Sequence, residues 1–99
     1  MLISNGMELS RDSVLVATRN MVDAPVGEGA VILQLQNGQY YGLDEVGVRI
    51  WDLLKAPVTI GDIEAVLLKE YDVDPEECHR EVVRLVSELM TEGLVEVQS

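Results

Sequence analysis

The side chains of this chain that could most readily take part in catalysis or metal binding are His79, its neighbour Cys78 and the acidic residues around them. His79 is the only histidine, and general-base catalysis would require it to pair with a carboxylate beside a nucleophile. Glu76 or Glu81 could supply the carboxylate, but no Ser or Cys has a defined place as the nucleophile. We therefore expect His79 to be a surface or groove residue, and we predict no catalytic residue.

Metal and phosphate sites find equally little support in the sequence. Cys78 and His79 alone fall short of the four or so ligands of a zinc site, and Cys78 is expected to be a small buried apolar residue. The acids at 72–77 lack the glycine and the final glutamate of a calcium loop, and fit the start of a helix instead. Residues 27–29 lack the Lys and Ser/Thr of a phosphate loop. We predict no metal and no cofactor, which leaves binding as the leading class of function.

The charge of the chain restricts the partner that could be bound. The 99 residues include 7 basic and 18 acidic side chains, for a net charge of −11. This charge argues against binding to nucleic acid or to anionic membranes, and it favours a basic partner. Solubility alone is an equally good explanation. Nothing resembles a signal peptide or a membrane span, so we expect a cytoplasmic protein.

Hydrophobic periodicity predicts the elements that would position a binding site. Residues 1–12 are expected to be a flexible N-terminal segment, and residues 13–99 to form one domain. Strands are predicted at 13–18, 30–36 and 39–43, with a loop at 19–28 and a tight turn at Asn37-Gly38. Helices are predicted at 44–55, 60–71 and 75–92, with Asp44, Thr59 and Asp74 as N-caps and Gly93 after the last one. Residues 94–97 either add a short strand or seal the core.

This order of elements predicts an α+β domain in which a three-stranded antiparallel sheet is followed by a three-helix bundle. The three short helices and the closing segment give it the outline of a winged helix-turn-helix. The strand at 39–43 is short, follows a turn and leads directly into a helix, so it is expected at the sheet edge with unpaired backbone groups. Such an edge can capture an extended peptide as an added strand.

The third predicted helix would form the other wall of a groove beside that strand. On a helical wheel, its core stripe consists of Val82, Leu85, Val86 and Leu89. His79, Val83 and Met90 widen the apolar surface on one flank, which indicates either a groove or simply broad packing. Tyr40 and Tyr41 must point to opposite faces of their strand, and the sequence does not say which one enters the core.

The sequence resembles the PqqD-like family, the leader-peptide recognition elements of ribosomally made, modified peptides. The resemblance covers about residues 13–96 and is carried by GQYYGLDEVGVRIWDLL, TIGDIEAVLLKEYDVDP and LVSELMTEGLVE. Within the family, YYGLDEVGVRIW is most similar to the stand-alone proteins of lasso-peptide clusters, and the pyrroloquinoline-quinone member ranks second. The resemblance implies a non-catalytic protein that binds a precursor's leader as an extra antiparallel strand and delivers it to a leader peptidase.

The resemblance also implies which residues touch the leader. Strand contacts fall on Gln39, Tyr40, Tyr41 and Gly42, and the groove wall falls on Glu76, His79, Arg80, Val83, Ser87 and Met90. The acidic surface suits a basic, extended leader. Two other classes remain open, a winged-helix DNA-binding regulator and a scaffold subunit of a larger enzyme. The composition of the third helix argues against DNA binding, because it carries only two arginines and as many as five glutamates.

Overall fold

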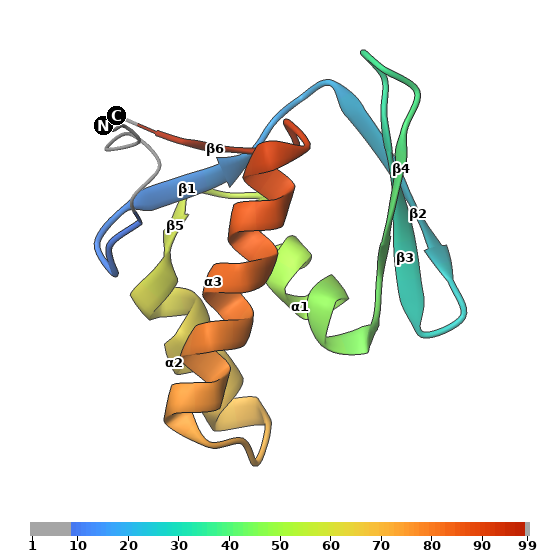
Figure 1. The fold of residues 1–99 in the computed structure, drawn as a ribbon. Helices are drawn as coiled ribbons and strands as arrows, with labels where there is room; N and C mark the ends of the chain where they lie inside the picture. Colours follow the sequence, from blue (N-terminus) through green and yellow to red (C-terminus); the bar gives the residue numbers. More distant parts are fainter. Residues whose placement is uncertain (1–8, 99) are drawn as a thin grey trace.

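Six short strands and three helices make up the computed structural model, which describes residues 9–98 (Figure 1). In chain order these are β1 (Val14–Ala17), β2 (Met21–Val26), β3 (Gly29–Gln34), β4 (Tyr40–Leu43), α1 (Glu45–Leu54), β5 (Val58–Thr59), α2 (Ile60–Glu70), α3 (Pro75–Thr91) and β6 (Val95–Val97). The strands form two antiparallel sheets, ordered β5-β1-β6 and β2-β3-β4. Helix α1 contacts strands of both sheets. The predicted α+β class is confirmed.

The predicted single sheet, however, is wrong. The expected loop at 19–28 contains β2, and β1 leaves that sheet to pair with β5 and β6. Pro25 lies within β2, which is an edge strand with β3 as its neighbour in the described part of the chain. An edge strand tolerates proline because the missing N–H can fall on the unpaired side. The final segment does form a strand, β6, although it joins β1 rather than the other sheet.

The tight turn also lies at a different place from the one predicted. Val26 pairs with Gly29, so two residues connect β2 to β3, and Gly27 adopts a positive φ of 60° there. Between β3 and β4, the amide of Gln34 donates to the carbonyl of Gln39 at 2.8 Å, which leaves a four-residue loop at 35–38. The Asn37-Gly38 pair therefore lies inside a longer loop, where Gly38 has a φ of 72°.

Local helix signals in the sequence agree with the structure. Asp44 caps α1 by accepting from the Gly47 amide at 2.8 Å, and Thr59 and Asp74 cap α2 and α3. Gly93 follows α3 with a φ of 75°. The predicted stripe of α3 is buried in full and packs with residues from all three helices and several strands. The fully buried side chains of the core are Trp51, Leu15, Ile32, Ile50, Leu54, Ile60, Ile63, Leu89, Leu94, Val82 and Val86.

Two polar contacts tie the β2-β3-β4 sheet to the helices. The indole of Trp51 on α1 donates to Asp23 on β2 at 2.6 Å. The buried amide of Gln34 on β3 donates to the carbonyls of Glu92 and Gly93, which follow α3, at 3.1 and 3.3 Å. Gln34 thereby bonds the carbonyls of the C-cap residue and of the glycine after it, and the Gly93 carbonyl also accepts from the Thr18 hydroxyl at 3.0 Å. These contacts fix the position of β4 relative to α3.

Candidate functional site

One edge of the β2-β3-β4 sheet is free, because β4 pairs only with β3 in the described part of the chain. Gln34 and Gln39 form a hydrogen-bonded pair, and such pairs alternate along an antiparallel ladder. Tyr41 and Leu43 therefore bond inward to β3. The N–H and C=O groups of Tyr40 and Gly42 point outward, where a further strand could pair with them.

A cavity of about 640 Å³ adjoins this edge, between β4, α1 and α3. Its apolar lining includes Leu43, Ile50, Leu67 and Leu85, and its rim carries Asp72, Glu77 and Glu81 together with Arg84. The groove thus combines unpaired backbone groups on one side with an apolar floor and a largely acidic rim. This combination suits an extended peptide that places apolar side chains into the cavity.

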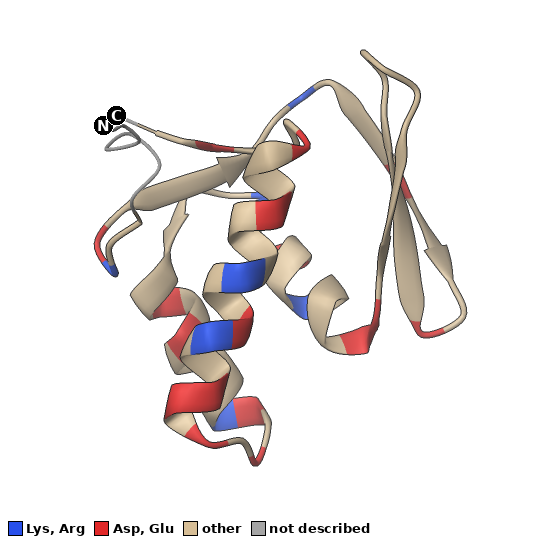
Figure 2. Ribbon diagram, viewed as in Figure 1, with Lys and Arg blue, Asp and Glu red and all other residues tan. Residues whose placement is uncertain are grey.

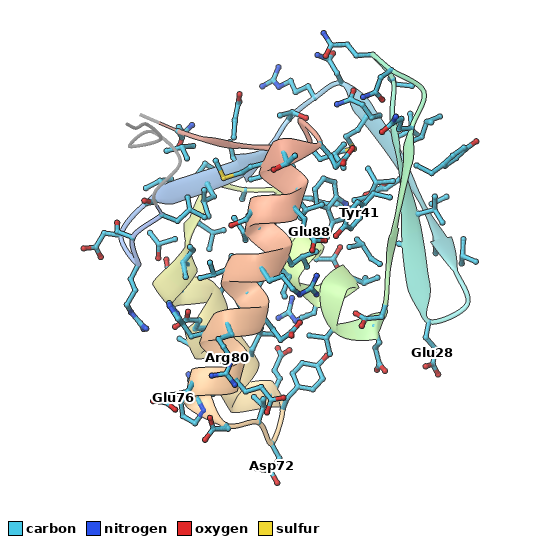
Figure 3. All side chains as sticks on the ribbon, in the orientation of Figure 1. Glu28, Tyr41, Asp72, Glu76, Arg80 and Glu88 are labelled. Carbon is cyan, nitrogen blue, oxygen red and sulfur yellow. The ribbon has the colours of Figure 1, made fainter. Side chains whose placement is uncertain are left out.

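Tyr41 spans the groove between β4 and α3. Its hydroxyl donates a hydrogen bond to Glu88, and the two side chains point toward one another in Figure 3. Arg84 also holds Glu88, at 2.8 Å, and bonds Glu81 at 3.0 Å. Burial and the Glu88 hydrogen bond raise the pKa of Tyr41 to about 12, and the same bond lowers the pKa of Glu88. The network keeps the tyrosine protonated and its ring in a fixed position.

A second, smaller cavity of about 290 Å³ lies on the other side of Tyr41, toward the end of α3. Ser87, Glu88, Thr91 and Glu92 line it along with Tyr41. Most of its lining surface is apolar, although these residues have polar side chains. Tyr41 therefore stands between two cavities of different size.

Acidic residues are frequent in α2, α3 and the loop that joins them, where the ribbon of Figure 2 is coloured red. Asp74 is engaged as the N-cap of α3, where it accepts from the amides of Glu76 and Glu77 at 3.1 and 3.2 Å. Arg84 neutralises part of the charge of Glu81 and Glu88 through its ion pairs. The remaining negative potential at the rim favours a basic ligand.

The structure brings together only part of the predicted site. Gln39, Tyr40, Tyr41 and Gly42 do lie along the free edge, with Tyr40 73% exposed and Tyr41 turned toward α3. Ser87 lines the smaller cavity. The other predicted wall residues are Glu76, His79, Arg80, Val83 and Met90, and none of them lines either groove cavity.

These residues occupy the opposite flank of α3. Glu76, His79 and Arg80 surround a separate hollow with Arg11 and Pro75, and Figure 3 shows Glu76 and Arg80 extending from α3 away from β4. Val83 and Met90 are half-buried against the core. A helical wheel identifies a core stripe but not which of its two flanks faces a given strand, and the flank toward β4 carries Glu77, Glu81, Arg84 and Leu85.

His79 contacts a buried carboxylate of a neighbouring helix. Its Nδ1 contacts the carboxylate of Glu64 on α2, and Arg11 bonds the other oxygen of Glu64 at 2.7 Å. Glu64 is only 3% exposed, so both partners compensate a buried charge. The spacing of Ile60, Ile63, Glu64 and Leu67 placed this glutamate in the buried stripe, a signal that sequence reasoning passed over. Arg11 belongs to the predicted flexible segment, of which residues 1–8 lie outside the described residues.

Other classes of site find no support in residues 9–98. No group of three or more His, Cys, Asp or Glu side chains there could hold a metal ion. Within the same range, no helix has both the length and the apolarity needed to cross a membrane. Cys78 is buried as expected, and burial raises the pKa of its thiol.

Comparison with known proteins identifies the family of the chain. Residues 29–95 match the family described as coenzyme PQQ synthesis protein D (PqqD). The chain belongs to the PqqD family. Stand-alone domains of this family are non-catalytic binding modules. No sequence among curated proteins matches it significantly.

Three solved structures are similar to this PqqD-family protein. TbiB1 in complex with the TbiA(beta) leader peptide is 32% identical, with a TM-score of 0.76 over 85% of this chain and 98% of that one. Lasso peptide synthetase B1, complexed with the leader peptide, is 23% identical, with a TM-score of 0.73 over 83% and 96%. The PqqD truncation of Methylobacterium extorquens PqqCD is 19% identical, with a TM-score of 0.75 over 92% and 97%. It represents a stand-alone recognition element for ribosomally synthesized, post-translationally modified peptides, and the present chain has that fold.

Proposed function

We propose that this protein binds the leader peptide of a ribosomally made precursor by adding it as an antiparallel strand to β4. The observation that carries the proposal is the free edge of β4 beside a large, apolar-floored cavity. Tyr40 and Gly42 offer about four outward backbone groups, each bond contributing a net ~0.5–1.5 kcal/mol. Two or three buried anchors would each add ~1.5–3 kcal/mol, less the cost of ordering the peptide. The sum is consistent with a Kd between roughly micromolar and nanomolar.

The leader we propose is basic and extended. Glu77 and Glu81 at the rim, with Asp72 nearby, would attract cationic side chains as the peptide approaches. We revise the proposed helix wall to Glu77, Glu81, Arg84 and Leu85, which line the larger cavity. Gln39, Tyr40, Tyr41, Gly42 and Ser87 are retained from the sequence-based set.

The pathway we propose is lasso-peptide biosynthesis. Support comes from TbiB1, which is 32% identical over most of both chains and was solved with a leader peptide. Similarity to the lasso peptide synthetase B1 fold adds to this. A chaperone of another modified-peptide pathway, including that of pyrroloquinoline quinone, is the second candidate because the family match carries that description.

The outer face of the β2-β3-β4 sheet supports the proposal that a leader peptidase docks on the protein. Val22, Val26 and Tyr40 are 53%, 59% and 73% exposed, and this face lies opposite the helices. A strand added beside β4 would extend the same face, so a peptidase seated there would touch both protein and leader. Val22→Lys is expected to slow leader cleavage by the peptidase without changing leader affinity. Equal slowing by Lys69→Glu, a charge change on α2 outside this sheet, would contradict the assignment.

A titration with N-methylated peptides tests strand addition directly. The ligand is a synthetic leader of about 20 residues from the precursor gene beside this one, with one backbone N–H methylated in each peptide. Affinity measured by calorimetry is expected to fall at alternate positions only, because only every second leader residue bonds β4. Amide NMR shifts should centre on residues 39–43 and on the Glu77–Glu88 flank of α3. Loss at no position, or at every position, would contradict strand addition. Absence of binding would contradict leader recognition and favour a scaffold role within a larger enzyme.

A further inference from the structure

The position of Tyr41 in the groove defines what a bound strand can place beside it. If a leader pairs with the outward groups of Tyr40 and Gly42, its residues opposite these two make the ladder bonds. The residue opposite Tyr41 then forms a non-hydrogen-bonded pair, with its side chain on the same face as the tyrosine ring. Such pairs bring the two Cβ atoms to about 4.5–5.5 Å, closer than any other cross-strand contact.

The Tyr41 ring cannot easily move aside for that residue. Its hydroxyl is held by Glu88, which Arg84 holds in turn at 2.8 Å. Arg84 is itself fixed by Glu81 at 3.0 Å, so the network reaches along α3 on the groove side. Rotation of Tyr41 would break its bond to Glu88 and expose a half-buried ring. The space available to a leader side chain opposite Tyr41 is therefore already fixed before the leader binds.

The two cavities lie on either side of this restricted position. Alternate residues of a strand share one face, so leader residues two before and two after the central one also face the groove. In an antiparallel strand, the earlier residue lies opposite Leu43, beside the apolar cavity of about 640 Å³. The later residue lies opposite Gln39, toward the smaller cavity of about 290 Å³.

We propose that Tyr41 is a specificity-determining residue that admits only a small side chain opposite itself. The leader class it defines has a large apolar residue, then a small residue, then a residue short enough for the smaller cavity, at alternate positions from N to C. This inference rests on the proposed strand addition. In this proposal, the Tyr41–Glu88–Arg84 network selects among leaders by the size of one side chain. Backbone pairing with β4, by contrast, would bind any extended leader.

A size exchange between protein and leader tests this assignment. Leaders carrying Ala, Leu or Phe at the residue that faces Tyr41, located by the N-methyl series, are titrated into wild type, Tyr41→Ala and Val22→Ala. Wild type is expected to bind the Ala leader at least tenfold more tightly than the Phe leader. In Tyr41→Ala the preference should shrink below threefold or reverse. Val22→Ala is the control, because Val22 lies on β2, away from the β4 edge and 53% exposed on the outer face, and the preference of this variant should remain that of wild type.

Further variants keep the test decisive. Should Tyr41→Ala unfold, Tyr41→Val provides the same opening with a β-branched residue suited to a strand. Tyr41→Phe keeps the ring and removes only the Glu88 bond, so its preference should fall two- to fivefold. Equal affinity of wild type for the Ala and Phe leaders, or an unchanged preference in Tyr41→Ala, overturns the inference while leaving strand addition intact. Failure of all leaders to bind wild type overturns both.

Discussion

Trp51 and Asp23 join the helical half of the protein to the sheet that carries the groove. The indole Nε1 donates to Oδ2 of Asp23 at 2.6 Å, and Lys55 Nζ lies 3.0 Å from the same oxygen. Trp51 is 1% exposed, so its N–H has no access to water. The Trp51 hydrogen bond, with a smaller contribution from Lys55, lowers the pKa of Asp23.

Removal of this carboxylate should therefore destabilise the fold. Asp23→Ala leaves the Trp51 N–H buried without an acceptor, and we expect the free energy of unfolding to fall by about 1–3 kcal/mol in urea titrations. Asp52→Ala is the control, since Asp52 meets only Lys55, at 3.7 Å and half-exposed. Its effect should stay within about 0.5 kcal/mol. Equal effects of the two substitutions would contradict a special role for the Trp51 contact.

The lowered pKa of Asp23 also predicts an acid dependence. In the unfolded chain this carboxyl takes up its proton near its ordinary pKa of about 4, and in the folded chain it does so at lower pH. The unfolded state thus binds more protons in this window, so the stabilisation is present above pH ~4 and is lost as the pH falls further. Wild type should exceed Asp23→Asn in stability at pH 6, and the difference should shrink below pH 4. A difference that is constant with pH would contradict this account.

Two Gln→Glu substitutions, at the buried Gln34 and the exposed Gln36, should differ strongly in their effect on stability. Its Nε2 donates to the carbonyls of Glu92 and Gly93, and the residue is only 4% exposed. Gln34→Glu replaces this donor with an oxygen that faces two carbonyls, and we expect a loss of more than about 2 kcal/mol. Gln36→Glu makes the same change on the exposed loop and should alter stability by no more than about 0.5 kcal/mol. Thermal unfolding by circular dichroism measures both, and similar losses would contradict the buried contact.

The Arg11–Glu64–His79 cluster predicts a particular order of stabilities. Arg11→Met leaves the buried carboxylate of Glu64 with one partner, and we expect it to cost about 1–3 kcal/mol. Glu64→Met removes the buried charge itself and leaves Arg11 and His79, whose side chains are 64% and 47% exposed, for water to solvate. Glu64→Met should therefore be the milder change. The double variant should match Glu64→Met alone in urea unfolding, whereas additive losses would show that Arg11 acts elsewhere.

Tyr41 predicts an alkaline transition that can be isolated spectroscopically. Burial and the Glu88 bond raise its pKa to about 12, so the difference in 295 nm absorbance between wild type and Tyr41→Phe should titrate near that value. Stopped-flow pH jumps allow measurement before unfolding. The ordinary phenol pKa is about 10, so the folded state holds the proton more tightly, and the stabilisation is full below pH ~10 and is lost as pH rises toward 12. Glu88→Gln should lower the pKa only partway, because burial is the larger cause. A wild-type midpoint near 10 would contradict the buried, bonded tyrosine.

Much of the site could be predicted from local sequence patterns. The position of β4 at the sheet edge followed from its short length and from the helix that begins at its end. Asp44, Thr59 and Asp74 cap the three helices as predicted, and the core stripe of α3 is the one that its periodicity indicated. These features depend on residues within about four positions of one another, which is the range over which periodicity and capping act.

The sequence by itself determined the α+β class, the helices, the edge strand and the acidic charge that favours a basic partner. Only the tertiary structure decided that β1 pairs with β5 and β6, that Pro25 lies in an edge strand, and that Gln34 and Glu64 are buried. It also decided that the flank of α3 with Glu81 and Arg84, and not the flank with His79 and Val83, faces β4. Two flanks of an amphipathic helix are equivalent in a wheel, and strand partners are chosen by contacts between residues far apart in the chain. Such choices depend on how the whole core packs, which no local pattern contains.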